Sequence, residues 1–198
     1  PGQVVRVGRK VVSKQDEMIV LAVNKPRGIV CTEERRERNS IVRFLDYPVR
    51  VTYAGRLDKD SRGLLLMTNN GDIINQMMRA ANCHEKEYKV TVDKEITADF
   101  LKQMSGGVPI LDTVTRPCRV EKLGKYTFSI TLTQGLNRQI RRMCQALGYE
   151  VKDLVRMRIM NIRLGSLREG QHRKLTDEEL NGLYEMMKDS RGEDYGRD

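Results

Sequence analysis

The sequence lacks the marks of a membrane or secreted protein. No hydrophobic run approaches the roughly 20 residues of a membrane-spanning helix, and no signal-like stretch precedes the first charges. The cysteines, Cys31, Cys83, Cys118 and Cys144, are scattered and form no C-x-x-C pair. This pattern is typical of reduced thiols in a cytosolic protein, so we expect a cytoplasmic location. The chain begins at Pro1 rather than at methionine, and we expect it to be part of a longer protein.

Signatures of metal and cofactor binding are also missing. The two histidines and the scattered cysteines have no zinc-ligand spacing, and the glycines fit no phosphate-binding loop. Asp58, Asp60 and Gly63 match three positions of a calcium-binding EF-hand loop. However, Arg62 and Asn69 stand where that loop needs a ligand and a bidentate glutamate. The sequence therefore predicts neither a metal nor a cofactor.

Charge is the most prominent feature of the composition. The 198 residues carry 36 lysines and arginines against 27 acidic residues, a net charge of +9, with a pI near 9.5. Hydrophobic residues make up 39%, which allows one sizeable domain with a heavily charged surface. A polyanionic partner is indicated, with nucleic acid as the first candidate. The simpler alternative is a soluble protein that happens to be basic.

A charged loop at residues 53–63 lies between two β-prone runs, residues 49–54 and 64–68. Such loops, at the ends of strands, are common places for functional residues. Arg56 and Lys59 flank Asp58, and nearby cations favour an ionised carboxylate. Asp58 is thus suited to act as a nucleophile or an electrostatic partner. The alternative is a solvated turn whose aspartate bonds its own backbone.

The hydrophobic periodicity predicts an α+β domain on a mixed, mainly antiparallel sheet flanked by helices. Strands are expected at residues 18–23, 49–54, 64–68, 87–92, 108–120, 126–132 and 154–164. Helices are expected at residues 40–46, 72–79, 97–104, 137–147 and from 176 to about 187. Residues 1–17 read as a short strand pair, and residues 188–198 as a disordered tail.

Four sequence blocks in order resemble the RsuA-type pseudouridine synthases. They are N-K-P-x-G at 24–28, G-R-L-D with S-x-G-L-L at 55–65, E-K-E-Y at 85–88 and G-L-N-R-Q-I-R-R-M at 135–143. Further runs at 84–88, 104–111 and 158–161 resemble the RluF-type large-subunit ribosomal RNA synthases within that family. The resemblance implies a pseudouridine synthase-like catalytic domain over residues 18–187. Residues 1–17 would then be the end of an S4-like RNA-binding domain, or else an edge hairpin of the main domain.

The resemblance also implies an activity, the isomerisation of uridine to pseudouridine in 23S ribosomal RNA, with transfer RNA as a further candidate substrate. By this likeness Asp58 is the nucleophile, Arg141 pairs with it, and Tyr88 stacks on the uracil and takes its C5 proton. Arg56 fills the space of a uridine flipped out of the RNA, a step that costs a few kcal/mol. The structural alternatives are an ion pair between Arg56 and Asp58, and a place in the hydrophobic core for Tyr88.

Further RNA contacts are predicted around these residues. Arg138, Arg141 and Arg142 share one face of the predicted helix, where the alternative is a solvated basic surface. Lys25 either supports the loop or meets phosphate. The full predicted RNA-binding set is Lys25, Arg56, Asn137, Arg138, Gln139 and Arg142. We expect a monomer that binds RNA and neither membrane nor metal. The rival hypothesis is a non-catalytic RNA-binding or ribosome-assembly module, in which Asp58 only orders a basic loop.

Overall fold

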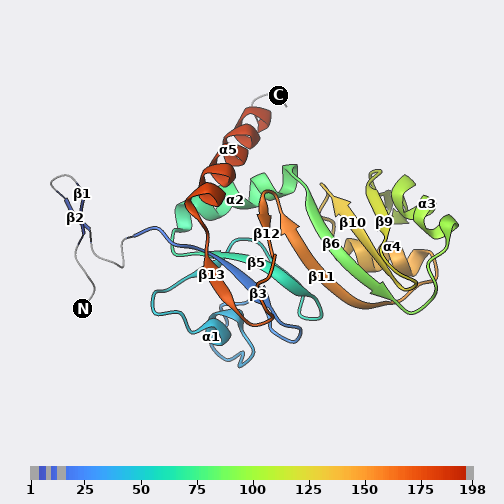
Figure 1. Ribbon diagram of the computed structural model, residues 1–198, viewed down its shortest axis with the longest axis horizontal. Helices are drawn as coiled ribbons and strands as arrows, with labels where there is room; N and C mark the ends of the chain where they lie inside the picture. The colour runs from blue at the N-terminus through green and yellow to red at the C-terminus, as the bar shows by residue number, and fades with distance from the viewer. Residues whose placement is uncertain (1–4, 8–9, 13–16, 195–198) are drawn as a thin grey trace.

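The computed structural model describes residues 5–7, 10–12 and 17–194 (Figure 1). The helices in this part of the chain are α1 Ile41–Leu45, α2 Gly71–Cys83, α3 Ala98–Gly106, α4 Gln139–Ala146 and α5 Asp177–Asp194. The strands are β1 Val5–Val7, β2 Lys10–Val12, β3 Val20–Lys25, β4 Thr52–Tyr53, β5 Arg62–Thr68, β6 Lys86–Val92, β7 Pro109–Ile110, β8 Thr113–Val114, β9 Arg119–Lys122, β10 Thr127–Leu132, β11 Val151–Ile159, β12 Ile162–Arg163 and β13 His172–Lys174.

One mixed sheet organises the fold and confirms the predicted α+β class. Its strand order is β13-β3-β5-β11-β6-β10-β9, with β4 paired to β5 and β12 paired to β11. The β5–β11 pair is parallel, whereas the other recorded pairs of this sheet are antiparallel. The parallel pair joins one half of the sheet, β13, β3 and β5, to the other half, β11, β6, β10 and β9. Segments distant in sequence therefore meet in the middle of the molecule.

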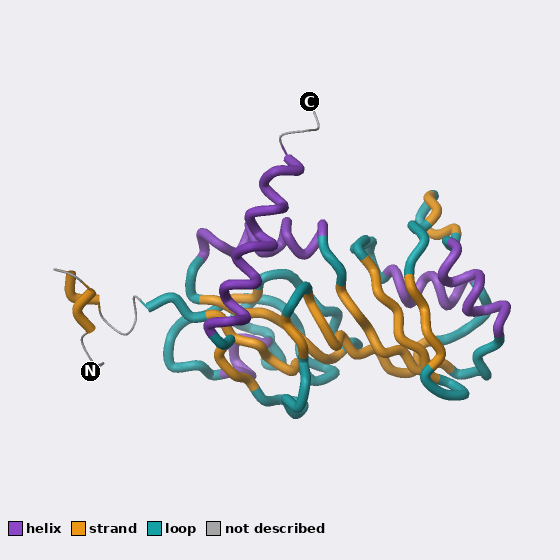
Figure 2. The backbone as a smooth tube through the Cα atoms, turned by 45° about the horizontal axis from the view of Figure 1, so that its top comes forward, coloured by secondary structure: helices purple, strands orange, loops and turns teal. Residues whose placement is uncertain are grey.

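Helices cover both faces of the sheet (Figures 1 and 2). Helices α2 and α5 cross on one face of the half that contains β3 and β5, and they bury Met77 and Leu183 against these two strands. Helix α1 packs on the opposite face through Ile41. Side chains alternate along β3, so Ala22 enters the first core and Leu21 the second. Helices α3 and α4 form a third core with β6 and β10.

Local capping explains where several helices begin. The Ser40 side chain accepts a hydrogen bond from the Arg43 amide and starts α1, which lies within the predicted helix at residues 40–46. The Thr97 hydroxyl does the same for α3 through the Phe100 amide. Helix α5 opens with a capping box, in which Thr176 and Glu179 exchange bonds between side chain and backbone.

Gly63 allows the two halves of the sheet to join. It pairs with Arg156, next to the Arg62–Val155 pair. Its φ is +110°, and a Cβ built on it would lie 2.4 Å from the Arg156 carbonyl oxygen and 2.6 Å from the Arg156 nitrogen. Both neighbours are backbone atoms held in the sheet, so the strands could not approach this closely around a side chain.

Gly63→Ala should therefore destabilise the fold strongly. Left-handed backbone costs about 1–3 kcal/mol for a residue with a side chain, and the clash with Arg156 adds to this. We expect the free energy of unfolding to fall by about 3 kcal/mol or more, measured by urea denaturation. Gly55→Ala is the matched control, because Gly55 has a φ of +100° and a Cβ added there would meet nothing within 4 Å. Equal losses in both variants would contradict a role for the close approach.

Two strands predicted as continuous are interrupted by turns. Residues 108–120 form β7, β8 and β9, because Leu111 and Asp112 adopt left-handed φ values of 48° and 59° and turn the chain into a hairpin. Residues 154–164 likewise divide into β11 and β12 around Met160, with φ 55°. The left-handed conformation is rare for residues other than glycine. Because Leu111, Asp112 and Met160 adopt it here, no glycine marks these turns in the sequence. Strand β13 was not predicted, since His172–Lys174 has no apolar alternation.

The ends of the chain differ partly from expectation. Strands β1 and β2 form the predicted pair as a two-stranded sheet of their own, and the S4-like assignment of residues 1–17 stays a prediction. Helix α5 continues to Asp194, beyond the expected end near residue 187. The predicted disorder of residues 188–198 stays a prediction, and residues 195–198 lie outside the described part of the chain.

Candidate active site

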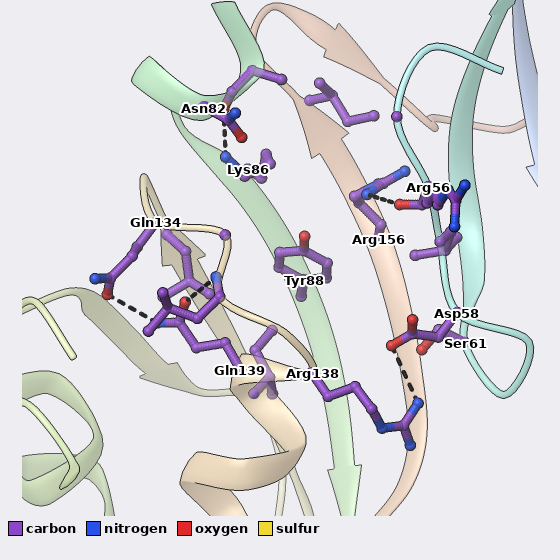
Figure 3. Close-up of a pocket in the computed structure, with 18 of the residues that line it drawn as sticks. Arg56, Asp58, Ser61, Asn82, Lys86, Tyr88, Gln134, Arg138, Gln139 and Arg156 are labelled. Carbon is purple, nitrogen blue, oxygen red and sulfur yellow. Dashed lines mark hydrogen bonds and ion pairs between the residues drawn. The ribbon is translucent and has the colours of Figure 1, made fainter. Parts of the chain in front are cut away.

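A pocket of about 500 Å³ opens where the two halves of the sheet meet. Its walls come from the loop after β4, the end of α2, strands β6 and β11, and the segment that leads from β10 into α4. Figure 3 shows Tyr88 in the middle of this pocket, with Asp58 and Arg138 on one side and Lys86 and Gln134 on the other. The structure thus brings together blocks that are widely separated in sequence.

The loop that carries Asp58 is held through its backbone carbonyls by three other segments. Arg156 Nη1 donates to the carbonyl of Arg56 at 3.2 Å, and the amide of Gly28 donates to that of Lys59 at 2.7 Å. Arg141 Nη2 donates to the carbonyl of Asp60 at 2.9 Å. These bonds fix the loop on both sides of Asp58, while the Asp58 side chain itself remains exposed at the pocket.

Arg138, rather than Arg141, contacts Asp58. Arg138 Nη1 lies 3.2 Å from Asp58 Oδ2, and the same guanidinium binds both oxygens of Asp60 at 3.0 and 2.7 Å. The hydrogen bond from Arg138 lowers the pKa of Asp60. The predicted Asp58–Arg141 ion pair is therefore wrong in this structure. Sequence spacing could not choose between two arginines on one helix face.

Arg141 instead binds the residues that follow Asp58 in the loop, Asp60 and Ser61. Its Nη2 donates to Ser61 Oγ at 3.1 Å as well as to the Asp60 carbonyl, and Nη1 lies 3.5 Å from Asp60 Oδ2. The side chain is only 13% exposed, and burial lowers the pKa of Arg141 while Asp60 opposes that shift. An arginine remains charged under these conditions, so the loop has a buried cation beneath it.

The backbone at Arg138 explains this arrangement. Arg138 is the residue before α4 and has a left-handed conformation, φ 48° and ψ 39°, so the helix begins at Gln139 and not at residue 137 as predicted. Gln139 is buried, with its amide bonded to Gln134 Oε1 and to the amide of Leu136. Gln139 therefore shapes the pocket wall, and its predicted contact with RNA stays a prediction.

Arg142 and Asn137 are bonded to each other. Arg142 Nε and Nη2 donate to the Asn137 carbonyl and to its Oδ1, each at 3.0 Å. Asn137 lines the pocket and is exposed, whereas Arg142 lies outside the pocket lining. Their predicted contacts with RNA stay predictions.

Tyr88 faces the pocket from the centre of β6. It is half-buried and packs against the α3/α4 core, so its ring has one supported and one open side. Side chains alternate along β6, which places Tyr88 and Val90 on one face, and Lys86 also lines the pocket. Leu154 forms part of the wall.

Arg56 lies exposed at the pocket, over the ring of Tyr53, with 5.9 Å from its guanidinium carbon to the ring centroid. No Arg56–Asp58 ion pair occurs among the described residues. Arg56 is therefore free to move toward a ligand, since a cation–π contact at an exposed site is worth only about 0.5–1 kcal/mol.

Lys25 is buried and cannot contact phosphate, so its predicted RNA-binding role is wrong. Its side chain is fully inaccessible, and Nζ donates to the carbonyls of Pro26 and Ile29 at 3.0 and 2.7 Å. Lys25 thereby orders the segment whose Gly28 amide holds the central loop. Burial lowers the pKa of Lys25 to about 8, although Asp58 lies close enough to oppose the shift.

The lowered pKa of Lys25 predicts a pH-dependent stability. Between about pH 8 and 10.4 the folded protein has released this proton and the unfolded chain still holds it, so unfolding takes up a proton. This contribution to the free energy of unfolding rises with pH. Relative to Lys25→Met, the unaltered protein should gain roughly 2 kcal/mol between pH 8 and 10.4, measured by urea denaturation. The exposed Lys152→Met is the control, and a difference that shrinks with pH would refute the assignment.

Sequence reasoning missed two cations that line the pocket, Lys86 and Arg156. Lys86 is 7% exposed and donates to the carbonyls of Ala81, His84 and Thr133, which ties together three segments of the wall. Burial lowers the pKa of Lys86 to about 8. Lys86 lies in β6 two residues before Tyr88, and this spacing could have predicted that the two side chains lie on the same face of the strand. For Arg156 the only signal was a charge inside an apolar strand.

The fold and the pocket define an RNA-modifying enzyme class, and the comparison with known families names it. Residues 19–146 match the RNA pseudouridylate synthase family, and the chain belongs to that family. It is 52% identical to the "Dual-specificity RNA pseudouridine synthase RluF" of Escherichia coli over 195 residues, covering 98% of this chain and 67% of that relative. It is 30% identical to "Ribosomal small subunit pseudouridine synthase A" of Haemophilus influenzae, covering 92% of this chain and 86% of the relative.

A solved pseudouridylate synthase has the same fold, with a TM-score of 0.77 and 31% identity over 87% of this chain and 76% of that structure. Within residues 5–7, 10–12 and 17–194, no helix is long and apolar enough to cross a membrane. The same residues contain no group of three or more His, Cys, Asp or Glu side chains that could hold a metal ion. The pocket groups available for chemistry there are Asp58, Tyr88 and several cations.

Proposed function

We propose that this pseudouridine synthase modifies 23S ribosomal RNA, with transfer RNA as a second substrate, and that the target uridine is flipped into the pocket. One observation carries the proposal: an exposed carboxylate, Asp58, and an open aromatic face, Tyr88, line the same pocket. The substrate assignment is supported by the resemblance to RluF-type synthases. The printed name of the Escherichia coli relative, which describes a dual-specificity enzyme, supports a second RNA.

Asp58 would begin the reaction by attacking the nucleoside. The bond between N1 and C1′ breaks, the uracil turns over on Tyr88, and C5 forms the new bond to C1′. The bond that Asp58 made, to the ribose or to the base, breaks again, and its electron pair returns to the Asp58 carboxylate. The C5 proton then passes to the phenol oxygen of Tyr88, whose own hydroxyl proton leaves to solvent, and N1 gains a proton. Arg138 supports this role, because its ion pair with Asp58 at 3.2 Å orients the carboxylate in the pocket.

Flipping a uridine costs a few kcal/mol, which the protein must offset. Stacking of the uracil on Tyr88 supplies about 1–3 kcal/mol. Arg56, exposed beside the pocket, would enter the gap that the uridine leaves in the RNA. The net charge of +9 favours binding of the phosphate backbone in general.

The reaction would take place in the cytoplasm. Cys31, Cys118 and Cys144 are free thiols, as expected in a reducing compartment.

Mapping of pseudouridines tests this proposal directly. Ribosomal and transfer RNA from cells that lack the protein should each lose modification at specific uridines, and expression of the unaltered protein should restore them. Expression of Asp58→Asn provides the control, since it should restore none. Unchanged 23S modification in the deleted cells would refute the ribosomal assignment, and a loss confined to transfer RNA would reassign the substrate.

A further inference from the structure

Arg156 has a donor group that neither the fold nor the proposed mechanism uses. The residue is only 7% exposed, yet it lines the pocket. Its Nε donates to the carbonyl of Leu64 at 2.8 Å and its Nη1 to that of Arg56 at 3.2 Å. Nη2 has no hydrogen-bond partner within the described part of the chain. Because a guanidinium has five N–H donors, Arg156 can serve the fold and still bind a ligand.

The guanidinium of Arg156 lies near both Tyr88 and the loop that carries Asp58. Arg156 in β11 is directly opposite Tyr88 in β6. Through Nη1 it holds the loop two residues before Asp58. Figure 3 shows the Arg156 side chain between the Tyr88 ring and the loop that carries Arg56 and Asp58. A pyrimidine stacked on Tyr88 would therefore have its edge beside Arg156.

Two other polar side chains of the pocket wall, Lys86 and Gln139, are already hydrogen-bonded within the protein. Lys86 Nζ donates to the carbonyls of Ala81, His84 and Thr133, and the Gln139 amide is bonded to Gln134 and Leu136. Both therefore form the wall. Arg156 differs from them in combining structural bonds with an unused donor at the pocket.

We propose that Arg156 reads the uracil, with Nη2 donating a hydrogen bond to one of its carbonyl oxygens. The inference rests on the proposed flipping of uridine into this pocket. An arginine only donates, so a contact at O4 favours uracil over cytosine, which carries a donating amino group at that position. A contact at O2 would position the uracil without this discrimination, since both bases carry that carbonyl. The same guanidinium orders the Asp58 loop, so recognition of the base and alignment of the carboxylate are coupled through one side chain.

A cycle between enzyme variants and substrate analogues tests this role. The substrate is an RNA hairpin that carries the uridine found by mapping, prepared with uridine, 2-thiouridine or 4-thiouridine at that position. Sulfur is a poor acceptor, so the thio-substitution at the contacted carbonyl should slow the single-turnover reaction of the unaltered protein. In Arg156→Met the extra slowing should disappear, a change of about tenfold in the ratio of the two rates. If Arg156 had a purely structural role, Arg156→Met would lower the reaction rates of all three substrates by the same factor.

Arg156→Lys provides a second variant if Arg156→Met fails to fold. Its ammonium can bind one carbonyl of the loop but lacks the separate Nη2 group that is proposed to bind the uracil. Arg158→Lys is the matched control: it lies in the same strand, pairs with Glu85 and Glu87, and does not line the pocket. Rate ratios that match the unaltered protein in a folded Arg156 variant would overturn the inference alone. An absence of any thio effect in the unaltered protein would overturn it as well. Failure of the proposed function differs, because the uridine hairpin itself would then not react.

Discussion

An Asp58→Asn protein is expected to fold and bind RNA but to form almost no pseudouridine. The amide keeps the shape of the side chain but cannot attack the nucleoside. Removal of a catalytic nucleophile in a protease costs about a million-fold in rate, and a loss on that order is expected here. RNA affinity should persist, because it depends mainly on cations elsewhere on the surface. Tritium release from C5-labelled uridine RNA, together with filter binding, measures both quantities.

Asp60→Asn is the matched control for this experiment. Asp60 shares Arg138 with Asp58 and has the shorter contact, 2.7 against 3.2 Å, and it also lies 3.5 Å from Arg141. If carboxylates in this loop served only to order it, Asp60→Asn would be at least as damaging as Asp58→Asn. The nucleophile hypothesis requires the reverse order. A folded Asp58→Asn protein that forms pseudouridine at a substantial rate would falsify the assignment.

Tyr88→Phe should bind RNA normally but react slowly. The phenyl ring retains the stacking surface, whereas the oxygen that accepts the C5 proton is lost. A positioned acid–base group contributes about 10²–10⁴-fold, so a decrease of about 100-fold or more in single-turnover tritium release is expected. Tyr88→Leu should additionally weaken productive binding, because base stacking on an aromatic ring is worth about 1–3 kcal/mol.

The control for the lost hydroxyl is Tyr149→Phe. Tyr149 donates a hydrogen bond to the Glu95 carbonyl at 2.9 Å and lies outside the pocket lining. It should cost some stability and leave the rate unchanged. If Tyr88→Phe reacted within a few-fold of the unaltered protein, Tyr88 would serve as a stacking surface only, and another group would have to take the proton.

The sequence alone determined features that depend on short-range physics. Ser40 and Thr97 begin helices because their hydroxyls reach amides three residues later. The alternation along β6 placed Tyr88 on one face with Val90, since successive side chains of a strand point to opposite sides. The charged loop around Asp58 lies between strands because apolar runs flank it. These assignments need no knowledge of distant contacts, and the family resemblance linked them to a reaction.

Only the tertiary structure decided which cations serve the site and how. Arg138 and Arg141 share a helix face in sequence, but the left-handed backbone at Arg138 directs it to Asp58 while Arg141 is buried beneath the loop. Lys25 looks like a surface lysine, yet it is enclosed by the packing of β3 against the loop. Arg156 reaches the site because the parallel β5–β11 pair places it beside Gly63. Each outcome depends on contacts between segments far apart in the chain, whose geometry is fixed only when the two halves of the sheet join.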